Sequence, residues 1–94
     1  MKTLKLTLKK KWFDMIASGE KREEYRVPSR WILSRLENKE YDAVEFKNGY
    51  GPNVPTITLE YLGWHMGYGR AEWGGESKPG EMLAVIRLGR IITP

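Results

Sequence analysis

Cysteine is absent from this chain of 94 residues. Its absence excludes disulfide bonds, thiolate metal sites and a cysteine nucleophile. Small domains that fold without disulfides are typical of a reducing cytosol, so we expect the protein to be cytoplasmic.

Histidine occurs once, as His65, directly after Trp64. No second ligand stands at metal-binding spacing from it, and a Ser-His-Asp triad would have to use this single side chain. We therefore expect His65 to be structural or simply exposed, and we expect neither a metal ion nor a cofactor.

Long apolar runs are missing as well. The segment from Met1 to Lys5 alternates polar and apolar side chains, so it lacks the apolar centre of a signal peptide. No stretch approaches the roughly 20 apolar residues that a helix needs to cross a bilayer. We expect a soluble protein without a membrane partner.

The familiar phosphate-binding loops are not found either. Ten glycines are present, but neither G-x-G-x-x-G after a strand nor G-x-x-x-x-G-K-[ST] occurs. Nucleotide binding through those loops is therefore not expected.

The charges that are present are unevenly distributed along the chain. The net charge is +4, and residues 1–47 hold 12 of the 16 basic and 8 of the 12 acidic side chains, so all of the excess lies in the first half. Clustered Lys and Arg favour a polyanionic partner such as RNA, because binding to phosphates releases counterions. The alternative is that the basic residues serve solubility alone.

Length and composition indicate one domain spanning residues 1–94. Hydrophobic residues make up 40% of the chain, which suffices for a single modest core. Apolar side chains recur at every second position in the earlier expected strands and at helical spacing in the helices, and the last expected strand is almost continuously apolar, as in a strand buried on both sides. The expected strands are 2–9, 22–27, 41–47, 56–64 and 82–92, and the expected helices are 10–18 and 29–38.

The order of these elements predicts a mixed α+β fold. Strands outnumber helices, and the two helices come early rather than in strict alternation with the strands. This order favours a small, strongly curved mixed sheet or barrel with two flanking helices. The glycine-rich segment 65–81 is expected to be a long loop, which in so small a domain is usually functional or mobile.

One charged segment follows the first expected helix. It reads Gly19-Glu20-Lys21-Arg22-Glu23-Glu24-Tyr25-Arg26 and fits the pattern G-x-K-x-x-E-x-R. Together with the preceding three-leucine strand and the terminal "AVIRLGRII", it resembles the signature of the ASCH domain family, which belongs to the PUA-like superfamily. The resemblance spans the whole chain.

The resemblance implies a small PUA-like β-barrel of about five or six strands with two flanking helices. It also implies a cleft lined by Lys21, Glu24 and Arg26, in a family that mainly binds RNA. Some small relatives are amidohydrolases acting on N4-acetylcytidine, with a lysine, a threonine three positions later and a distant glutamate. Lys21 matches that lysine, but Glu24 stands where the threonine would be. A hydrolase with Lys21 as base and Glu24 as its partner is therefore the alternative to a binding protein.

The residues of this segment support more than one interpretation. On a regular strand, Glu24 and Arg26 face away from Tyr25 and Val27, which we expect in the core. Lys21 would fall on the other face unless the chain turns after Gly19. The three charged side chains could bind a phosphate and a base, or Glu24 could bridge the two cations as a structural ion pair.

Further candidate nucleic-acid contacts lie outside the motif. Lys9 and Lys11 stand at the start of the first helix, where a phosphate could meet lysines and free amide groups together. Tyr50 and Trp73 lie in glycine-rich segments and could stack on bases, and Asn48 could read a base edge. Core packing is the competing explanation for Trp12 and Trp31. A third hypothesis is a protein-binding adaptor that uses its basic half to contact an acidic partner.

Overall fold

The computed structural model describes residues 1–93, and it confirms the expected fold class. Five strands and two α-helices occur near the expected positions, and a short 3-10 helix lies within the glycine-rich segment. In chain order the elements are β1 (Thr3–Leu8), α1 (Lys10–Ala17), β2 (Glu23–Arg26), α2 (Arg30–Leu36), β3 (Ala43–Asn48), β4 (Thr56–Gly67), η1 (Ala71–Trp73) and β5 (Leu83–Thr93).

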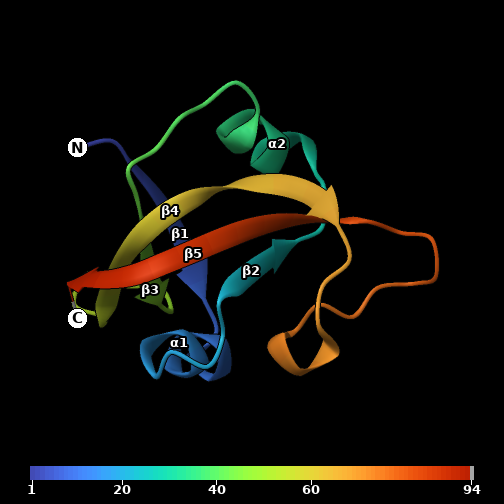
Figure 1. Ribbon diagram of the computed structural model, residues 1–94. Coiled ribbons are helices and arrows are strands. Elements are labelled where there is room, and N and C mark those ends of the chain that lie inside the picture. The colour runs from blue at the N-terminus through green and yellow to red at the C-terminus, as the bar shows by residue number, and fades with distance from the viewer. Residues whose placement is uncertain (94) are drawn as a thin grey trace.

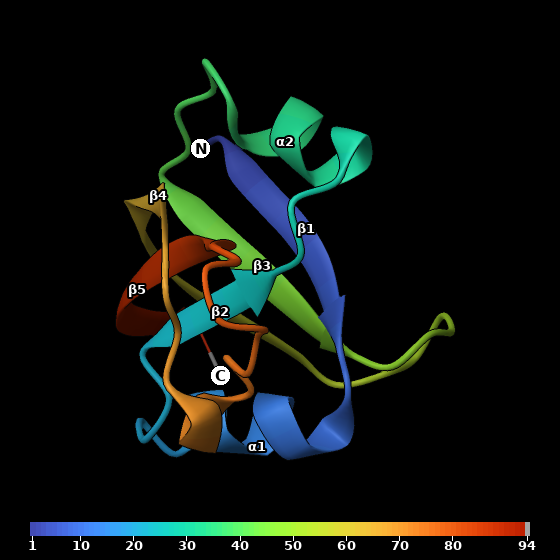
Figure 2. The same cartoon turned by 90° about the vertical axis from the view of Figure 1, so that its right-hand side faces the viewer.

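The five strands form one sheet in the order β1-β3-β4-β5-β2. β1 pairs with β3 in parallel, and the other neighbouring pairs are antiparallel. β4 and β5 are long, and their register shifts between Thr58 and Trp64, where bulges bend the strands. The sheet curls into a half-barrel whose two edge strands, β1 and β2, face one another (Figures 1 and 2).

The concave side of this half-barrel holds the main core. Leu4, Leu6 and Leu8 point inward from β1, because side chains at every second position of a strand share a face. α1 closes one end of the half-barrel and α2 lies at the other end (Figure 1). Each helix contributes apolar side chains at helical spacing: Phe13 and Ile16 from α1, and Ile32 and Leu36 from α2.

A second, smaller core lies on the opposite face of β2 and β5. Tyr25, Leu83 and Val85 form it, and Trp73 packs against them from the 68–82 segment. Val27 does not join this cluster: its exposed fraction is 75%, so its predicted core position is wrong. The reason is that β2 ends at Arg26 and the chain leaves the sheet at Pro28.

The helices of residues 1–93 are all short. None of them is long and apolar enough to cross a membrane.

Candidate nucleic-acid interface

A turn after α1 brings Lys21 next to Glu24. Gly19 adopts a positive φ of 87°, which only glycine reaches without strain, and the backbone N–H of Lys21 donates to the carbonyl of Met15 at 3.0 Å. The Lys21 Nζ therefore lies 3.4 Å from Glu24 Oε1. The sequence predicted that Lys21 and Glu24 would come together only if the chain turned after Gly19, and the structure has this turn.

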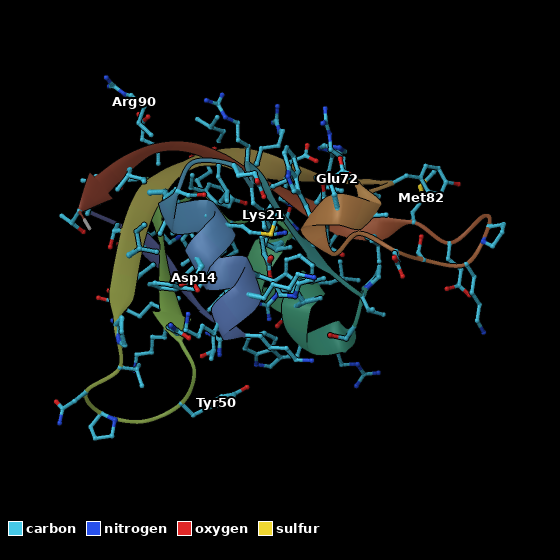
Figure 3. The ribbon with its side chains drawn as sticks, turned by 90° about the horizontal axis from the view of Figure 1, so that it is seen from below. Asp14, Lys21, Tyr50, Glu72, Met82 and Arg90 are labelled. Carbon is cyan, nitrogen blue, oxygen red and sulfur yellow. The ribbon has the colours of Figure 1, made fainter. Side chains whose placement is uncertain are left out.

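The Lys21 side chain is enclosed on all sides. It is 1% exposed, and its Nζ donates to the carbonyl oxygen of Trp73. The same Nζ lies 5.3 Å from the ring centre of Trp12 and 4.7 Å from that of Tyr25, so two aromatic faces meet the cation. Figure 3 shows Lys21 between α1 and η1. Burial lowers the pKa of Lys21, while the neighbouring Glu24 carboxylate acts in the opposite direction.

Glu24 in turn holds Arg26. The Glu24 side chain is 7% exposed, and its Oε2 accepts from Arg26 Nε at 2.9 Å. Arg26 Nη2 donates to the carbonyl oxygen of Thr7 at 2.8 Å. Because Arg26 lies on β2 and Thr7 on β1, this guanidinium joins the two edge strands of the half-barrel. Glu24 thus bridges two cations, as the structural interpretation of the motif predicts.

Only Arg26 of the three motif side chains reaches a pocket at this junction, which we call the seam pocket. Its side chain is 25% exposed, and the pocket has a volume of about 300 Å³. Three cations and two aromatic rings lie in its lining, and no acidic residue does. The lining consists of Lys5, Leu6, Thr7, Arg26, Trp31, Lys47 and Tyr50.

Local structure explains why these side chains meet. Lys5 lies on the outward face of β1, and the parallel pairing with β3 brings Lys47 opposite Thr7. Trp31 stands in the first turn of α2, which begins at the Ser29 cap, and it is 52% exposed. Tyr50 is 91% exposed, on the loop that projects between β3 and β4 (Figure 3).

The loop that carries Tyr50 depends on two glycines. Gly49 and Gly51 both adopt positive φ, and no atom crowds Gly49. Asn48 ends β3 beside them, and its backbone N–H donates to Pro55 at 2.9 Å, which closes the hairpin. Asn48 is half-buried and lies outside the lining of the seam pocket.

Three other predicted contacts are not gathered at the seam pocket. Lys9 occupies the N-cap position of α1 without a capping hydrogen bond from its side chain, and Lys11 lies over the ring of Trp12 at 4.8 Å. Both lie outside the pocket lining. Trp73 is half-buried, packs on the second core and lies beneath the Arg70 guanidinium at 4.7 Å. Because Trp73 lies in a glycine-rich segment, we predicted that its ring could stack on a base. The group of Trp73 that contacts Lys21 is its backbone carbonyl.

Sequence reasoning missed Lys5 and Lys47, and left Trp31 open between core and surface. The available signal was the alternation of apolar and polar residues, which places Lys5 on the outward face of β1 and Lys47 on the outward face of β3. The parallel pairing of two strands that are not neighbours in sequence was needed to bring these lysines to one place. His65, by contrast, is exposed, in line with one of the two expectations for it.

Tyr25 fastens the 68–82 segment over β2. Its Oη donates to Glu23 Oε1 at 2.6 Å and accepts from the backbone N–H of Arg70 at 3.1 Å. Burial, with the Glu23 carboxylate adding to it, raises the pKa of Tyr25 to about 12. The two hydrogen bonds of the Tyr25 hydroxyl join β2 to the segment that supplies the Trp73 carbonyl.

The chemistry of the seam pocket is that of cations and aromatic rings. Within residues 1–93, no three side chains among His, Asp and Glu gather closely enough to hold a metal ion.

Comparisons with protein families, with curated proteins and with solved structures found no match for this chain. The proposal of a function therefore rests on the residues of the seam pocket.

Proposed function

We propose that this protein binds single-stranded RNA or a nucleotide at the seam pocket. The observation that carries the proposal is a pocket whose lining holds three cations, two exposed aromatic side chains and no acidic residue. Cations that neutralise phosphates combined with rings that stack on bases are the usual means of holding single-stranded nucleic acid.

Arg26 supplies a cation in a fixed position. Glu24 holds its Nε and the Thr7 carbonyl holds its Nη2, while its Nη1 has no hydrogen-bond acceptor within residues 1–93. A guanidinium fixed in this way loses little freedom when a phosphate binds, and charge-assisted bonds to phosphate are among the stronger hydrogen bonds. In this proposal Lys21 and Glu24 position Arg26 and do not themselves contact the ligand.

Trp31 and Tyr50 supply the stacking surfaces. Both rings are exposed, and neither belongs to a core cluster. A base stacked on such a ring contributes about 1 to 3 kcal/mol. Lys5 and Lys47 then lie where they can meet the phosphates on either side of a bound base.

The resemblance to the ASCH family supports the same function. The motif residues Gly19, Lys21, Glu24 and Arg26 converge in space, and the curled half-barrel with two helices is compatible with a PUA-like barrel. We therefore propose membership of that family together with its RNA-binding role.

A hydrolase acting on an acylated nucleoside is the second candidate. Burial lowers the pKa of Lys21, which is what a general base requires. The Lys21 side chain is, however, 1% exposed, and its amine already donates to the Trp73 carbonyl and contacts two aromatic rings, so a substrate would have to displace some of these groups to reach it. Incubation with N4-acetylcytidine and chromatography for cytidine tests this candidate, and lack of turnover would eliminate it.

Binding is tested by fluorescence anisotropy of a labelled oligouridylate at several salt concentrations. Three phosphate contacts predict a slope of log affinity against log salt of about −2, because each contact on a single strand contributes about −0.7. Lys5→Gln and Lys47→Gln should each reduce the slope by about 0.7. Lys78→Gln is the matched control, since Lys78 lies outside the seam pocket.

The aromatic side chains are tested in the same titration. Tyr50→Ala and Trp31→Ala should each weaken binding by roughly 5- to 100-fold, the equivalent of one stacked base. Tyr68→Ala is the control, because Tyr68 is 60% exposed and does not line the pocket. Affinity that ignores salt, or equal affinity in these variants and their controls, would overturn the proposal.

A further inference from the structure

A second pocket opens beside the end of α2 that is remote from Trp31. It has a volume of about 640 Å³ and is formed by the N-terminal segment, the loop between α2 and β3, and the middle of β4. We call it the rim pocket. Its main lining side chains are Lys2, Tyr41, Asp42, Tyr61, Trp64 and Arg87.

Aromatic rings dominate the wall of the rim pocket. Tyr41 and Tyr61 meet edge to face, with ring centres 5.3 Å apart and planes at 77°. Trp64 lies beside them on β4, and all three residues are partly buried against the main core while they line the pocket. The wall therefore offers apolar, π-rich surface to a flat ligand.

The charges around the rim pocket favour an anionic ligand. Three cations and two carboxylates line it: Lys2, Lys39, Arg87, Glu40 and Asp42. Asp42 Oδ2 already accepts from the backbone N–H of Lys2 at 2.8 Å, and the Lys2 ammonium lies over the Tyr41 ring at 5.5 Å. The excess of positive charge opposes an ammonium ligand and suits a base attached to a phosphate.

Arg35 connects the rim pocket to the seam pocket. Its guanidinium lies over the ring of Trp31 at 5.1 Å, and its backbone carbonyl accepts a hydrogen bond from the Tyr41 hydroxyl. Trp31 lines the seam pocket and Tyr41 lines the rim pocket. α2 has 7 residues, so it spans about 10 Å between the two pockets.

We infer that one RNA strand occupies both pockets, with a base in each and its backbone crossing α2 at Arg35. This inference rests on the function proposed for the seam pocket and extends it to a binding site of several nucleotides. Small barrels that bind single strands cover about 4 to 16 nucleotides, so a site of this length suits the fold. Arg35 meets the phosphates between the two bases, and Arg87 meets those at the rim pocket.

The test compares uridine monophosphate with labelled oligouridylates of two, four and eight nucleotides. The variants are Arg35→Gln and Arg87→Gln. Arg90→Gln is the control, because Arg90 is 91% exposed and lies on the other side of the molecule from Tyr50 (Figure 3). Thermal unfolding of each variant verifies its fold, and NMR titration measures the mononucleotide.

We expect affinity to rise steeply between the dinucleotide and the octanucleotide. Arg87→Gln should lower octanucleotide affinity by roughly 5- to 10-fold and leave mononucleotide affinity unchanged. Arg35→Gln should lower octanucleotide affinity by a similar factor and by more than it lowers mononucleotide affinity, because Arg35 also contacts the Trp31 ring of the seam pocket. Arg90→Gln should change neither. Equal octanucleotide affinity in wild type and both variants would overturn the inference and leave the seam pocket as the site. Equal losses for every length, the mononucleotide included, would also overturn it, because the rim pocket would then be the primary site. If neither mononucleotide nor octanucleotide binds at all, the proposed function itself fails.

Discussion

Arg26 on β2 donates through Nη2 to the carbonyl oxygen of Thr7 on β1, at 2.8 Å. This hydrogen bond joins the first and last strands of the sheet order, which no backbone pairing connects. Behind it, Glu24 and Lys21 form an ion pair that is almost completely buried. Stability, loop attachment and the proposed ligand contact therefore involve one continuous group of side chains.

Glu24→Ala should lower the free energy of unfolding by about 3 to 5 kcal/mol, because it leaves the buried Lys21 ammonium without its carboxylate partner. Urea denaturation measures the loss. Asp14→Ala is the matched control: Asp14 pairs with Lys10, but the two side chains are 52% and 78% exposed. Exposed pairs on a helix contribute only about 0.3 to 0.5 kcal/mol. Similar losses in the two variants would contradict the structural role of Glu24.

Tyr25 should make stability fall at high pH. Its pKa is about 12 in the folded protein and 10.0 as the ordinary value, so the unfolded chain releases the proton first. The contribution is complete below pH 10.0 and is lost as the pH rises toward 12, by about 2 to 3 kcal/mol in total. Unfolding by guanidinium across this pH range measures the decline. Tyr25→Phe should remove that part of the slope, and an unchanged slope in the variant would refute the assignment.

Lys21 should be the lysine that acylating reagents modify most slowly. Its amine is enclosed by the Trp73 carbonyl and two aromatic rings, whereas the Lys10 side chain is 78% exposed. Brief treatment with acetic anhydride, followed by digestion and mass spectrometry, gives the rate at each lysine. Rapid acetylation of Lys21 in the folded protein would show that the 68–82 segment opens readily.

Gly75→Ala should detach the 68–82 segment. A Cβ at position 75 would lie 2.6 Å from the Gly69 backbone, so the backbone at position 69 or at position 75 must move. Overpacking of this kind costs about 1 to 3 kcal/mol. The tryptophan emission should shift to longer wavelength as Trp73 becomes exposed to water, and the acetylation rate of Lys21 should increase. Gly67→Ala is the control, because its new Cβ would be crowded only by the exposed His65 side chain, at 3.1 Å, and would lie at an ordinary contact distance of 3.8 Å from Val85.

The sequence was sufficient to predict the parts of the fold that local patterns determine. Leu4, Leu6 and Leu8 alternate, so β1 and its inward face could be predicted before any pairing was known. Val27 continues the same alternation after Tyr25, and the prediction failed there because a strand ends where its backbone leaves the sheet. Pairing with β5 stops at Arg26, one residue before the strand end that Pro28 indicates in the sequence.

The candidate site was predictable in part for a related reason. The spacing of Glu24 and Arg26 on one strand placed them together, and both do contact each other. Lys5 and Lys47 come from strands separated by α1, β2 and α2, and only the parallel pairing of those strands brings them to the seam pocket. Burial of Lys21 depends on the 68–82 segment, whose course over β2 is set by contacts far apart in the sequence.

The hydrogen bond from Arg26 to Thr7 also bears on how the protein behaves in concentrated solution. An edge strand exposes unpaired backbone groups, and a strand from another molecule can add to them and start aggregation. Arg26 occupies one such carbonyl on β1 and places a positive charge beside it. The side chain proposed to hold RNA therefore also protects the chain against intermolecular strand pairing, and nucleic acid bound there would extend that protection along the edge.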